Sequence, residues 1–327
     1  MLKATALAAT FAVASISAPS FAQDANQSVT SITVFGDSLV DAGNVNSLNP
    51  AVASSANGYF DGRFTNGYDY TDLLSLSLFG TPTTASLEGG TNFAFGGARA
   101  TNTSAVPDLG EQLGLFQGYL AAGNEVDPTG LYVLNFGGND IFAALQPGAP
   151  AGYDSDSAYL MVAANSYAQG LQSLVDLGAT NFLITGFPNA VPQSIEAEGY
   201  LFSALGALPL GEGVNVNFFS YLDFFNRLST DPTAFGLPAD LDFMTTCQAA
   251  GALPDCTGYF SFDGVHPTAA VHQAAFNDIQ AQFGFAAASG AVPEPATWAL
   301  MILGFGLAGA AMRRANAQRR RVAIAYA

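Results

Sequence analysis

The sequence predicts an α/β fold in which a mainly parallel sheet lies between two layers of helices. Four continuous apolar stretches have the length of strands and carry no charge, as strands buried on both faces do. Helical patterns separate these stretches, and strands that alternate with helices form a parallel sheet. The roughly 265 residues between positions 23 and 289 suffice for one domain with a full core, or at most two.

The predicted elements alternate along the chain. Strands are predicted over residues 31–36, 91–95, 131–136 and 181–187. Helices are predicted over residues 68–78, 158–177 and 215–228. Two stretches rich in Gly, Pro and Ala, residues 145–156 and 188–213, are predicted to be loops. The carboxyl ends of parallel strands meet at one edge of the sheet, where open α/β folds place their functional sites.

Short motifs follow three of the predicted strands. Residues 35–44 read Phe-Gly-Asp-Ser-Leu-Val-Asp-Ala-Gly-Asn, and a tight turn there would present the Ser38 hydroxyl to solvent. Residues 92–98 read Asn-Phe-Ala-Phe-Gly-Gly-Ala, in which a glycine lets the backbone approach a reacting carbonyl. Residues 136–140 read Phe-Gly-Gly-Asn-Asp, which also fits a helix cap. Because all three follow strands, we expect them to meet in space.

A fourth motif, Asp-Gly-Val-His at residues 263–266, contains one of the two histidines of the chain. This spacing lets one short segment bring a carboxylate to one imidazole nitrogen of His266 while the other nitrogen faces the serine. The second histidine, His272, lies on a predicted helix with no acidic residue just before it. We expect His272 to be a surface residue of that helix. Four apolar residues share one face of the same helix: Val271, Ala275, Ile279 and Phe283.

Taken together and in this order, the four motifs resemble those of the GDSL/SGNH esterase-lipase family. The resemblance implies a flavodoxin-like three-layer α/β/α sandwich, the SGNH hydrolase fold. It implies that Ser38 is the nucleophile, His266 its general base and Asp263 the acid that orients the base. The N–H groups of Ser38 and Gly97 and the side-chain amide of Asn139 would form the oxyanion hole. The reaction needs no metal ion and no organic cofactor.

The predicted activity is the hydrolysis of carboxylic esters through an acyl-enzyme, with a small ester, a lipid or an acylated sugar as substrate. A lipase, a phospholipase or an acyltransferase of the same family remains open, because one triad serves all of them. A non-catalytic extracellular-matrix binding protein on this scaffold is the alternative from another class. Four phenylalanines either line an acyl groove or, as their helical spacing favours, form a core face: Phe218, Phe219, Phe224 and Phe225.

Three residues are predicted to have structural roles. Arg63 lies in a stretch, residues 60–67, that also resembles the longer, phospholipase-like branch of the family, and we expect it to form an ion pair. The two cysteines, Cys247 and Cys256, suit one disulfide in an exported chain, which would staple the loop before the fourth motif. Two free thiols are the alternative. The sequence has no spacing typical of a metal site.

The amino-terminal end is typical of a secretory signal peptide. Residues 1–22 contain Lys3, then an apolar run, and end in Ser-Phe-Ala, which predicts cleavage after Ala22. The hydrolase domain is then predicted over residues 23–289.

The carboxyl-terminal segment, residues 290–327, combines three features. Val-Pro-Glu-Pro at 292–295 leads into an uncharged stretch at 296–312, which is at the short end of what crosses a bilayer, and five arginines follow. This arrangement resembles the Pro-Glu-Pro (PEP-CTERM) sorting signal of Gram-negative bacteria, which implies processing by an exosortase. A plain membrane anchor is the alternative. Both place the catalytic domain beyond the inner membrane, at the cell surface, in the extracellular matrix or in the periplasm.

The charge distribution limits the partners of the chain. Between Asp24 and Glu294, 26 acidic residues face three arginines and no lysine, which leaves a net charge of −23. Such a field repels nucleic acids and anionic lipid head groups. We therefore exclude nucleic-acid binding and expect a neutral ester or an acylated sugar as substrate in preference to an anionic phospholipid.

Overall fold

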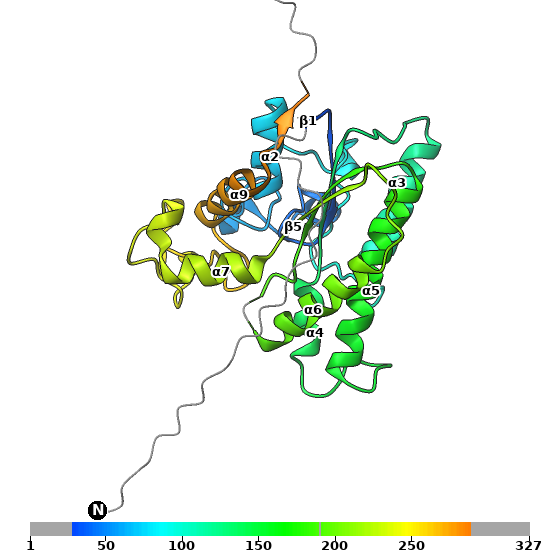
Figure 1. Cartoon of the computed structure of the whole chain (residues 1–327). Coiled ribbons are helices and arrows are strands. Elements are labelled where there is room, and N and C mark those ends of the chain that lie inside the picture. The colour runs from blue at the N-terminus through cyan, green and yellow to red at the C-terminus, as the bar shows by residue number, and fades with distance from the viewer. Residues whose placement is uncertain (1–27, 190, 289–327) are drawn as a thin grey trace, which may run out of the picture. The chain divides into compact units, whose positions relative to one another are not determined.

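The computed structural model describes residues 28–189 and 191–288 (Figure 1). Its central sheet has four parallel strands in the order β2 (Ile32–Gly36), β3 (Leu131–Asn135), β4 (Asn181–Thr185) and β5 (Asn215–Phe219). The strands start level, because Ile32 pairs with Leu131, Leu131 with Asn181, and Asn181 with Asn215. Their carboxyl ends therefore line up along one edge of the sheet.

The segment 91–95, predicted to be a strand, runs along the outer edge of β2. The Val34 N–H donates to the Thr91 carbonyl (3.0 Å), and the N–H groups of Phe93 and Phe95 donate to the carbonyls of Val34 and Gly36 (2.7 and 3.1 Å). Its regular pairing with β2 is limited to a bridge between Val34 and Asn92. The segment is thus extended and parallel to β2 without forming a full strand, and it carries the second motif to the same edge as the first.

Helices cover both faces of the sheet, which confirms the predicted flavodoxin-like three-layer α/β/α sandwich (Figure 1). One face is covered by α3 (Leu109–Ala121), α5 (Asp156–Asp176) and α6 (Pro192–Gly206). The opposite face is covered by α2 (Tyr70–Phe79), α7 (Tyr221–Thr230) and α9 (Ala269–Phe283). A short helix, α4 (Gly138–Ala144), follows β3 at the carboxyl edge of the sheet.

The strands are buried on both faces, as their continuous apolar sequences predict. In β3, Tyr132 and Leu134 pack with the α3, α5 and α6 layer, and Leu131 and Val133 pack with the opposite layer. Full burial of an aliphatic side chain of this kind contributes about 1.5–3 kcal/mol. The same four residues thus hold two helical layers together through one strand.

Short elements complete the described part of the fold. They are α1 (Asn44–Leu48), α8 (Cys247–Ala250), the 3₁₀ turns Ser55–Asn57, Ser86–Glu88 and Pro232–Phe235, and the strands β1 (Ser28–Val29) and β6 (Ala286–Ala287). β1 and β6 pair in parallel. The two ends of the described chain therefore lie side by side.

Two predicted segments were wrong. Residues 215–228, predicted as one helix, form β5 and then α7, and the Ser220 side chain between them caps α7 by accepting from the Asp223 N–H (3.1 Å). Pairing with β4 overrides the helical spacing of the first five residues. Residues 188–213, predicted as a loop, contain α6, which begins at Pro192 and buries Ala197, Leu201 and Leu205 at a spacing of four.

The predicted signal peptide and the predicted span at 296–312 lie outside the described residues. Among the helices that the structure describes, none has the length and apolar character needed to cross a membrane.

Candidate active site

The turn after β2 presents Ser38 to His266. In this turn the Leu39 N–H donates to the Asp37 carboxylate (3.0 Å), and the Val40 N–H donates to the Asp37 carbonyl (3.2 Å). The Ser38 side chain is half-buried, and its Oγ lies 2.8 Å from Nε2 of His266. The predicted nucleophile and base, 228 residues apart in the sequence, are therefore in hydrogen-bond contact.

Asp263 and His266 share one tight turn. Gly264 within it has a φ of +102°, a conformation that residues with a side chain rarely adopt. Nδ1 of His266 lies 2.7 Å from Oδ2 of Asp263, while the backbone N–H groups of Val265 and His266 donate to Oδ1 (2.9 and 2.8 Å). The carboxylate thus fixes the imidazole with Nε2 directed at Ser38.

The environment keeps Asp263 ionised. Burial alone would raise its pKa, but the hydrogen bond and charge of His266, together with the backbone N–H groups of His266 and Val265, lower the pKa of Asp263 to about 2. A permanent negative charge at this position stabilises the imidazolium that forms when His266 accepts a proton.

Asn139 lies in the first turn of α4 and lines the same cavity as Ser38 and His266. Its Nδ2 donates to the Ala98 carbonyl (2.9 Å), which places the amide beside the glycine turn at residues 96 and 97. Gly97 is exposed, has a φ of +90° and lies outside the cavity lining. Ser38, His266 and Asp263 are thus hydrogen-bonded in series, Asn139 lines the same cavity as Ser38 and His266, and Gly97 adjoins Asn139 through Ala98.

Two backbone N–H groups of the predicted oxyanion hole are free to bind a ligand. Among the described residues, the N–H groups of Ser38 and Gly97 donate no hydrogen bond. The N–H of Gly96, in contrast, donates to the buried carboxylate of Asp41 (2.9 Å). Asp41 also accepts from the N–H of Gly43 (2.8 Å), so it ties the glycine turn to the segment that follows Ser38.

A cavity of about 240 Å³ opens at Ser38. One part of its wall is apolar and is formed by Leu39, Phe142, Phe225, Phe243, Phe260 and Val265. The polar residues of the wall, besides Ser38 and His266, include Asn139, Asn189, Asn226 and Ser229. Of the four phenylalanines weighed for an acyl groove, Phe225 lines this cavity, whereas Phe219 and Phe224 are buried in the core and Phe218 packs against it.

A buried polar network underlies the nucleophile turn. Oδ1 of Asp37, the residue before Ser38, accepts from Nδ2 of Asn135 (3.2 Å), and Oδ1 of Asn135 accepts from the Tyr70 hydroxyl (3.1 Å). Burial raises the pKa of Asp37 to about 7, even though its hydrogen bonds oppose the shift. Sequence reasoning assigned no role to Asp37.

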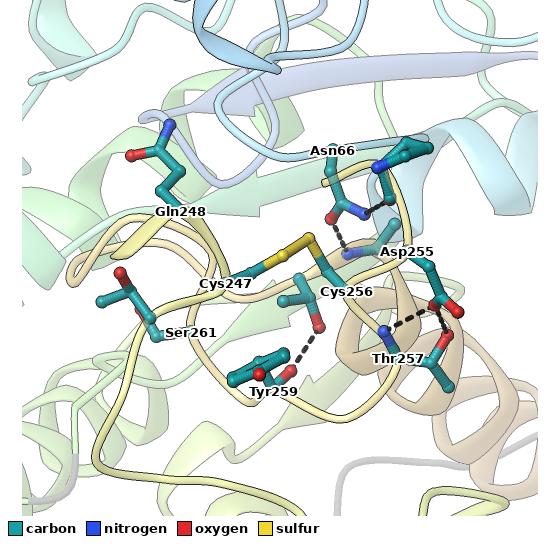
Figure 2. Close-up of a disulfide and its surroundings, with 12 residues drawn as sticks. Asn66, Cys247, Gln248, Asp255, Cys256, Thr257, Tyr259 and Ser261 are labelled. Atoms are coloured by element: carbon teal, nitrogen blue, oxygen red, sulfur yellow. Dashed lines mark hydrogen bonds between the residues drawn. A yellow bond between two sulfur atoms is a disulfide. The ribbon is translucent and has the colours of Figure 1, made fainter. Parts of the chain in front are cut away.

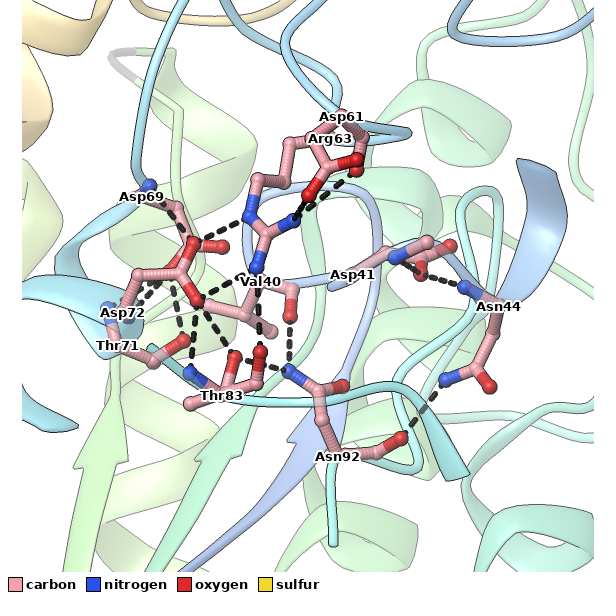
Figure 3. Close-up of polar contacts among 11 residues, drawn as sticks. Val40, Asp41, Asn44, Asp61, Arg63, Asp69, Thr71, Asp72, Thr83 and Asn92 are labelled. Carbon is pink, nitrogen blue, oxygen red and sulfur yellow. Dashed lines mark hydrogen bonds and ion pairs between the residues drawn. The ribbon is translucent and has the colours of Figure 1, made fainter. Parts of the chain in front are cut away.

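Arg63 forms the structural ion pair that we expected (Figure 3). Its Nε and Nη2 donate to the two carboxylate oxygens of buried Asp72 (2.6 and 3.0 Å). Asp72 also accepts from the Thr83 hydroxyl (2.7 Å), and Nδ2 of Asn92 bridges Thr83 Oγ1 (3.2 Å) and the Val40 carbonyl (2.7 Å). This network is linked to the turn of Ser38 through the Val40 carbonyl, and its side chains do not line the cavity.

Cys247, the first residue of α8, forms a disulfide with Cys256 (Figure 2). Both cysteines are buried and pack with Phe262, and the half-buried Tyr59 packs against the same cluster. Because Phe262 immediately precedes Asp263, the disulfide braces the turn that carries Asp263 and His266.

Two aromatic residues outside the predicted site contact the triad. The Tyr59 hydroxyl donates to Oδ2 of Asp263 (2.8 Å), and the Phe64 ring contacts His266. The only sequence signal for Tyr59 and Phe64 is their place in or beside the stretch 60–67.

His272, predicted at the surface, is 3% exposed and stacks near Tyr70 of α2, because it faces inward from α9. Burial lowers the pKa of His272 to about 3, with a smaller contribution from His266.

Comparison with known families gives two matches. Residues 32–279 match the family model described as GDSL-like Lipase/Acylhydrolase. Residues 291–315 match the PEP-CTERM protein-sorting motif.

Among individual proteins, the chain is 26% identical over 285 residues to a thermolabile hemolysin of Vibrio parahaemolyticus, covering 75% of this chain and 62% of that protein. It is 27% identical to acetylajmalan esterase 2 of Rauvolfia serpentina, covering 74% of this chain and 87% of that protein. A protein from the trpE-trpG intergenic region of Pseudomonas putida is 30% identical, with 46% of its length covered. The chain thus spans less than two thirds of the hemolysin and of the Pseudomonas protein.

A solved structure of a carbohydrate esterase, described as having an active site with "divergent catalytic and non-catalytic binding functions", aligns with a TM-score of 0.42 and 14% identity. The alignment covers 76% of this chain and 66% of that one, and a likeness this distant supports no statement about function.

Proposed function

Because the chain belongs to the GDSL-like lipase/acylhydrolase family, we propose that it hydrolyses carboxylic esters with Ser38 as nucleophile. The observation that carries the proposal is the hydrogen-bonded series from Ser38 Oγ to His266 Nε2 (2.8 Å) and from His266 Nδ1 to Asp263 Oδ2 (2.7 Å). A serine hydroxyl is a weak nucleophile near neutral pH, and an adjacent base held by a third group activates it.

The reaction proceeds in two halves. His266 Nε2 takes the Ser38 proton while Oγ attacks the carbonyl carbon of the ester, and Asp263 stabilises the imidazolium. The tetrahedral intermediate collapses as Nε2 gives its proton to the leaving alkoxide, which departs as the alcohol. Water then attacks the acyl-enzyme with Nε2 again as base, so that the carboxylic acid leaves and Ser38 regains its proton.

The oxyanion of each tetrahedral intermediate is bound by the N–H groups of Ser38 and Gly97 and by the Asn139 amide. The free state of both backbone N–H groups supports this assignment, as does the bond from Asn139 to Ala98, which leaves the second amide hydrogen for the oxyanion. Each such donor contributes about 3–4 kcal/mol to transition-state stabilisation.

The cavity supports an apolar acyl group as the part of the substrate that enters beside Ser38. Its wall includes four phenylalanines, and its volume of about 240 Å³ is below that of pockets for drug-sized ligands. An acyl chain of short to medium length would bury its methylenes there, at about 0.8 kcal/mol for each. An acetyl group has one methyl to bury and would leave most of this apolar wall without contact.

We place the enzyme outside the cytoplasm. The PEP-CTERM motif at residues 291–315 supports export in a Gram-negative bacterium and processing by an exosortase. The predicted signal peptide at residues 1–22 agrees with this route.

The test is hydrolysis of p-nitrophenyl esters from acetate to palmitate by the purified protein, by its Ser38→Ala variant and by Ser203→Ala, an exposed serine on α6. We expect the activity of the unmodified protein to peak between butanoate and decanoate, to vanish in Ser38→Ala and to persist in Ser203→Ala. Activity that survives in Ser38→Ala would exclude the proposed nucleophile. A folded protein inactive on every ester would favour a non-catalytic binding role.

A further inference from the structure

A tyrosine outside the four motifs contacts the acid of the triad. The Tyr59 hydroxyl donates to Oδ2 of Asp263 (2.8 Å), the same oxygen that lies 2.7 Å from Nδ1 of His266. Oδ1 of Asp263 is occupied by two backbone N–H groups. The carboxylate therefore has four hydrogen-bond donors, two on each oxygen, and Tyr59 is the one that comes from a distant part of the sequence.

We propose that Tyr59 is a positioning residue that sets how strongly Asp263 holds a proton on His266. This inference rests on the proposed function, because it concerns the base of the same reaction. A donor that shares Oδ2 with the imidazole takes up part of the negative charge that would otherwise favour the imidazolium. Loss of the Tyr59 hydroxyl should therefore leave more of that charge to the imidazolium.

The surrounding contacts hold Tyr59 in one orientation. Its ring meets Phe262 edge to face at a centroid distance of 5.0 Å, and Phe262 precedes Asp263 in the chain. Gln248, the residue after Cys247, donates from its backbone N–H to the Phe262 carbonyl (3.1 Å) and from its side chain to the Asn57 carbonyl (2.9 Å). The disulfide-linked helix α8 thus clamps the Tyr59 segment to the Asp263 turn, and Figure 2 shows Gln248 beside the disulfide.

The ionisation states agree with a permanent donor. Burial and the hydrogen bond to Asp263 raise the pKa of Tyr59 to about 12, so the phenol keeps its proton throughout the range in which an esterase is assayed. Two further titratable groups lie near His266: His272 on α9, which burial keeps uncharged with a pKa of about 3, and Asp37, which lines the cavity with His266. Neither contacts Asp263.

The experiment compares the full chain with Tyr59→Phe and with Tyr259→Phe. Tyr59→Phe keeps the ring against Phe262 and removes only the donor. Tyr259 is the matched control, because it is a half-buried tyrosine packed against the same disulfide cluster and its hydroxyl has no contact with Asp263. Two readouts are followed in all three proteins: the pH dependence of kcat/KM, and the NMR titration of the imidazole signals.

In Tyr59→Phe we expect kcat to fall roughly three- to tenfold with KM nearly unchanged, because the Asp263 carboxylate loses one of the four donors that fix its position, and the net effect of one ordinary hydrogen bond is of this order. The acid limb of kcat/KM and the NMR titration of His266 should both move to higher pH by about half a unit. Tyr259→Phe should match the unmodified protein in both readouts.

A Tyr59→Phe protein whose imidazole titrates as in the unmodified chain would overturn the inference. The NMR readout needs no turnover, and the chain has only two histidines, one of which is buried. If the unmodified protein hydrolyses no ester while the NMR shift is present, the proposed function fails and the role of Tyr59 stands.

Discussion

Phe64 packs against the imidazole of His266, with ring centroids 5.2 Å apart and ring planes tilted by 41°. The tip of the Phe64 ring leaves no room for a side chain at Gly96, where a Cβ would lie 2.3 Å from Cζ of Phe64. Gly96, Phe64 and His266 therefore lie in contact one after another, and the absence of a side chain at Gly96 lets Phe64 and His266 keep their places.

Substitution of Gly96 should disturb these contacts. We expect Gly96→Ala to push Phe64 toward His266 and to lower kcat by about 10- to 100-fold, because misplacement of a catalytic group by about 1 Å has costs of that order. Gly114→Ala, at an open position on α3, is the control and should leave the rate unchanged. Steady-state kinetics on one ester compare kcat of the two variants, and a fully active Gly96→Ala protein would show that the place of His266 does not depend on Gly96.

Loss of the Asn139 amide should act on the chemical step. Asn139→Ala should reduce kcat by about 100- to 1,000-fold and change KM little, because the amide meets charge that exists only in the transition state. Asn165→Ala, an exposed asparagine of α5, provides the control. If Asn139→Ala raises KM and leaves kcat intact, the amide binds substrate and is not an oxyanion donor.

The buried ion pair of Arg63 with Asp72 should contribute more to stability than the exposed ion pairs of Arg227. The side chains of Arg63 and Asp72 are 4% and 0% exposed, so Arg63→Ala leaves a buried charge unpaired and should lower the free energy of unfolding by about 3–5 kcal/mol. Arg227, 41% exposed beside Asp223 and Asp278, should contribute no more than about 1 kcal/mol. Urea denaturation of the two alanine variants measures both, and equal losses would contradict the contrast.

Stability should decline as pH rises through the weakly acidic range. Burial raises the pKa of Asp37 to about 7, of Asp41 to about 6 and of Glu198 to about 7. Unfolded carboxyls titrate near pH 4, so between about pH 4 and 7 the folded state holds protons that the unfolded state has released. The free energy of unfolding therefore falls with rising pH over this window.

The opposite sign holds at lower pH. Asp263, with a pKa of about 2, contributes stability that is lost as pH falls from about 4 toward 2. We expect the urea midpoint to be highest near pH 4–5, with a shallower decline above it in Asp37→Asn. A midpoint that increases steadily from pH 5 to pH 8 would disagree with the burial of these carboxyls.

Sequence periodicity predicted the elements whose burial is regular. In α9, Val271, Ala275, Ile279 and Phe283 are all buried, as their shared face required. The same reasoning misplaced His272, which packs near Tyr70 because α9 also contacts α2 on its adjacent face. A single helix pattern shows which residues face the sheet, but it does not show what a neighbouring helix covers.

Ambiguous spacing explains the error at β5. The asparagines and phenylalanines of residues 215–219 fit both a helix face and a short strand, and the partner that decides, β4, lies more than 30 residues earlier (Asn181 pairs with Asn215). The contact of Tyr59 with Asp263 was missed for the same reason, because 204 residues separate the two in the sequence. Motifs predicted which side chains would gather at the sheet edge, and only the fold shows which residues support them.

The pairing of β1 with β6 brings the two ends of the described chain together at the edge of the sheet that lies away from Ser38. Both short strands adjoin the amino end of β2, whereas Ser38 follows its carboxyl end, about 16 Å away at 3.3 Å for each strand residue. In Figure 1, β1 lies at the top and α4, which carries Asn139, near the bottom. The two ends of the described chain thus lie at the edge of the sheet opposite to Ser38, so an ester that reaches the carboxyl edge meets neither of them.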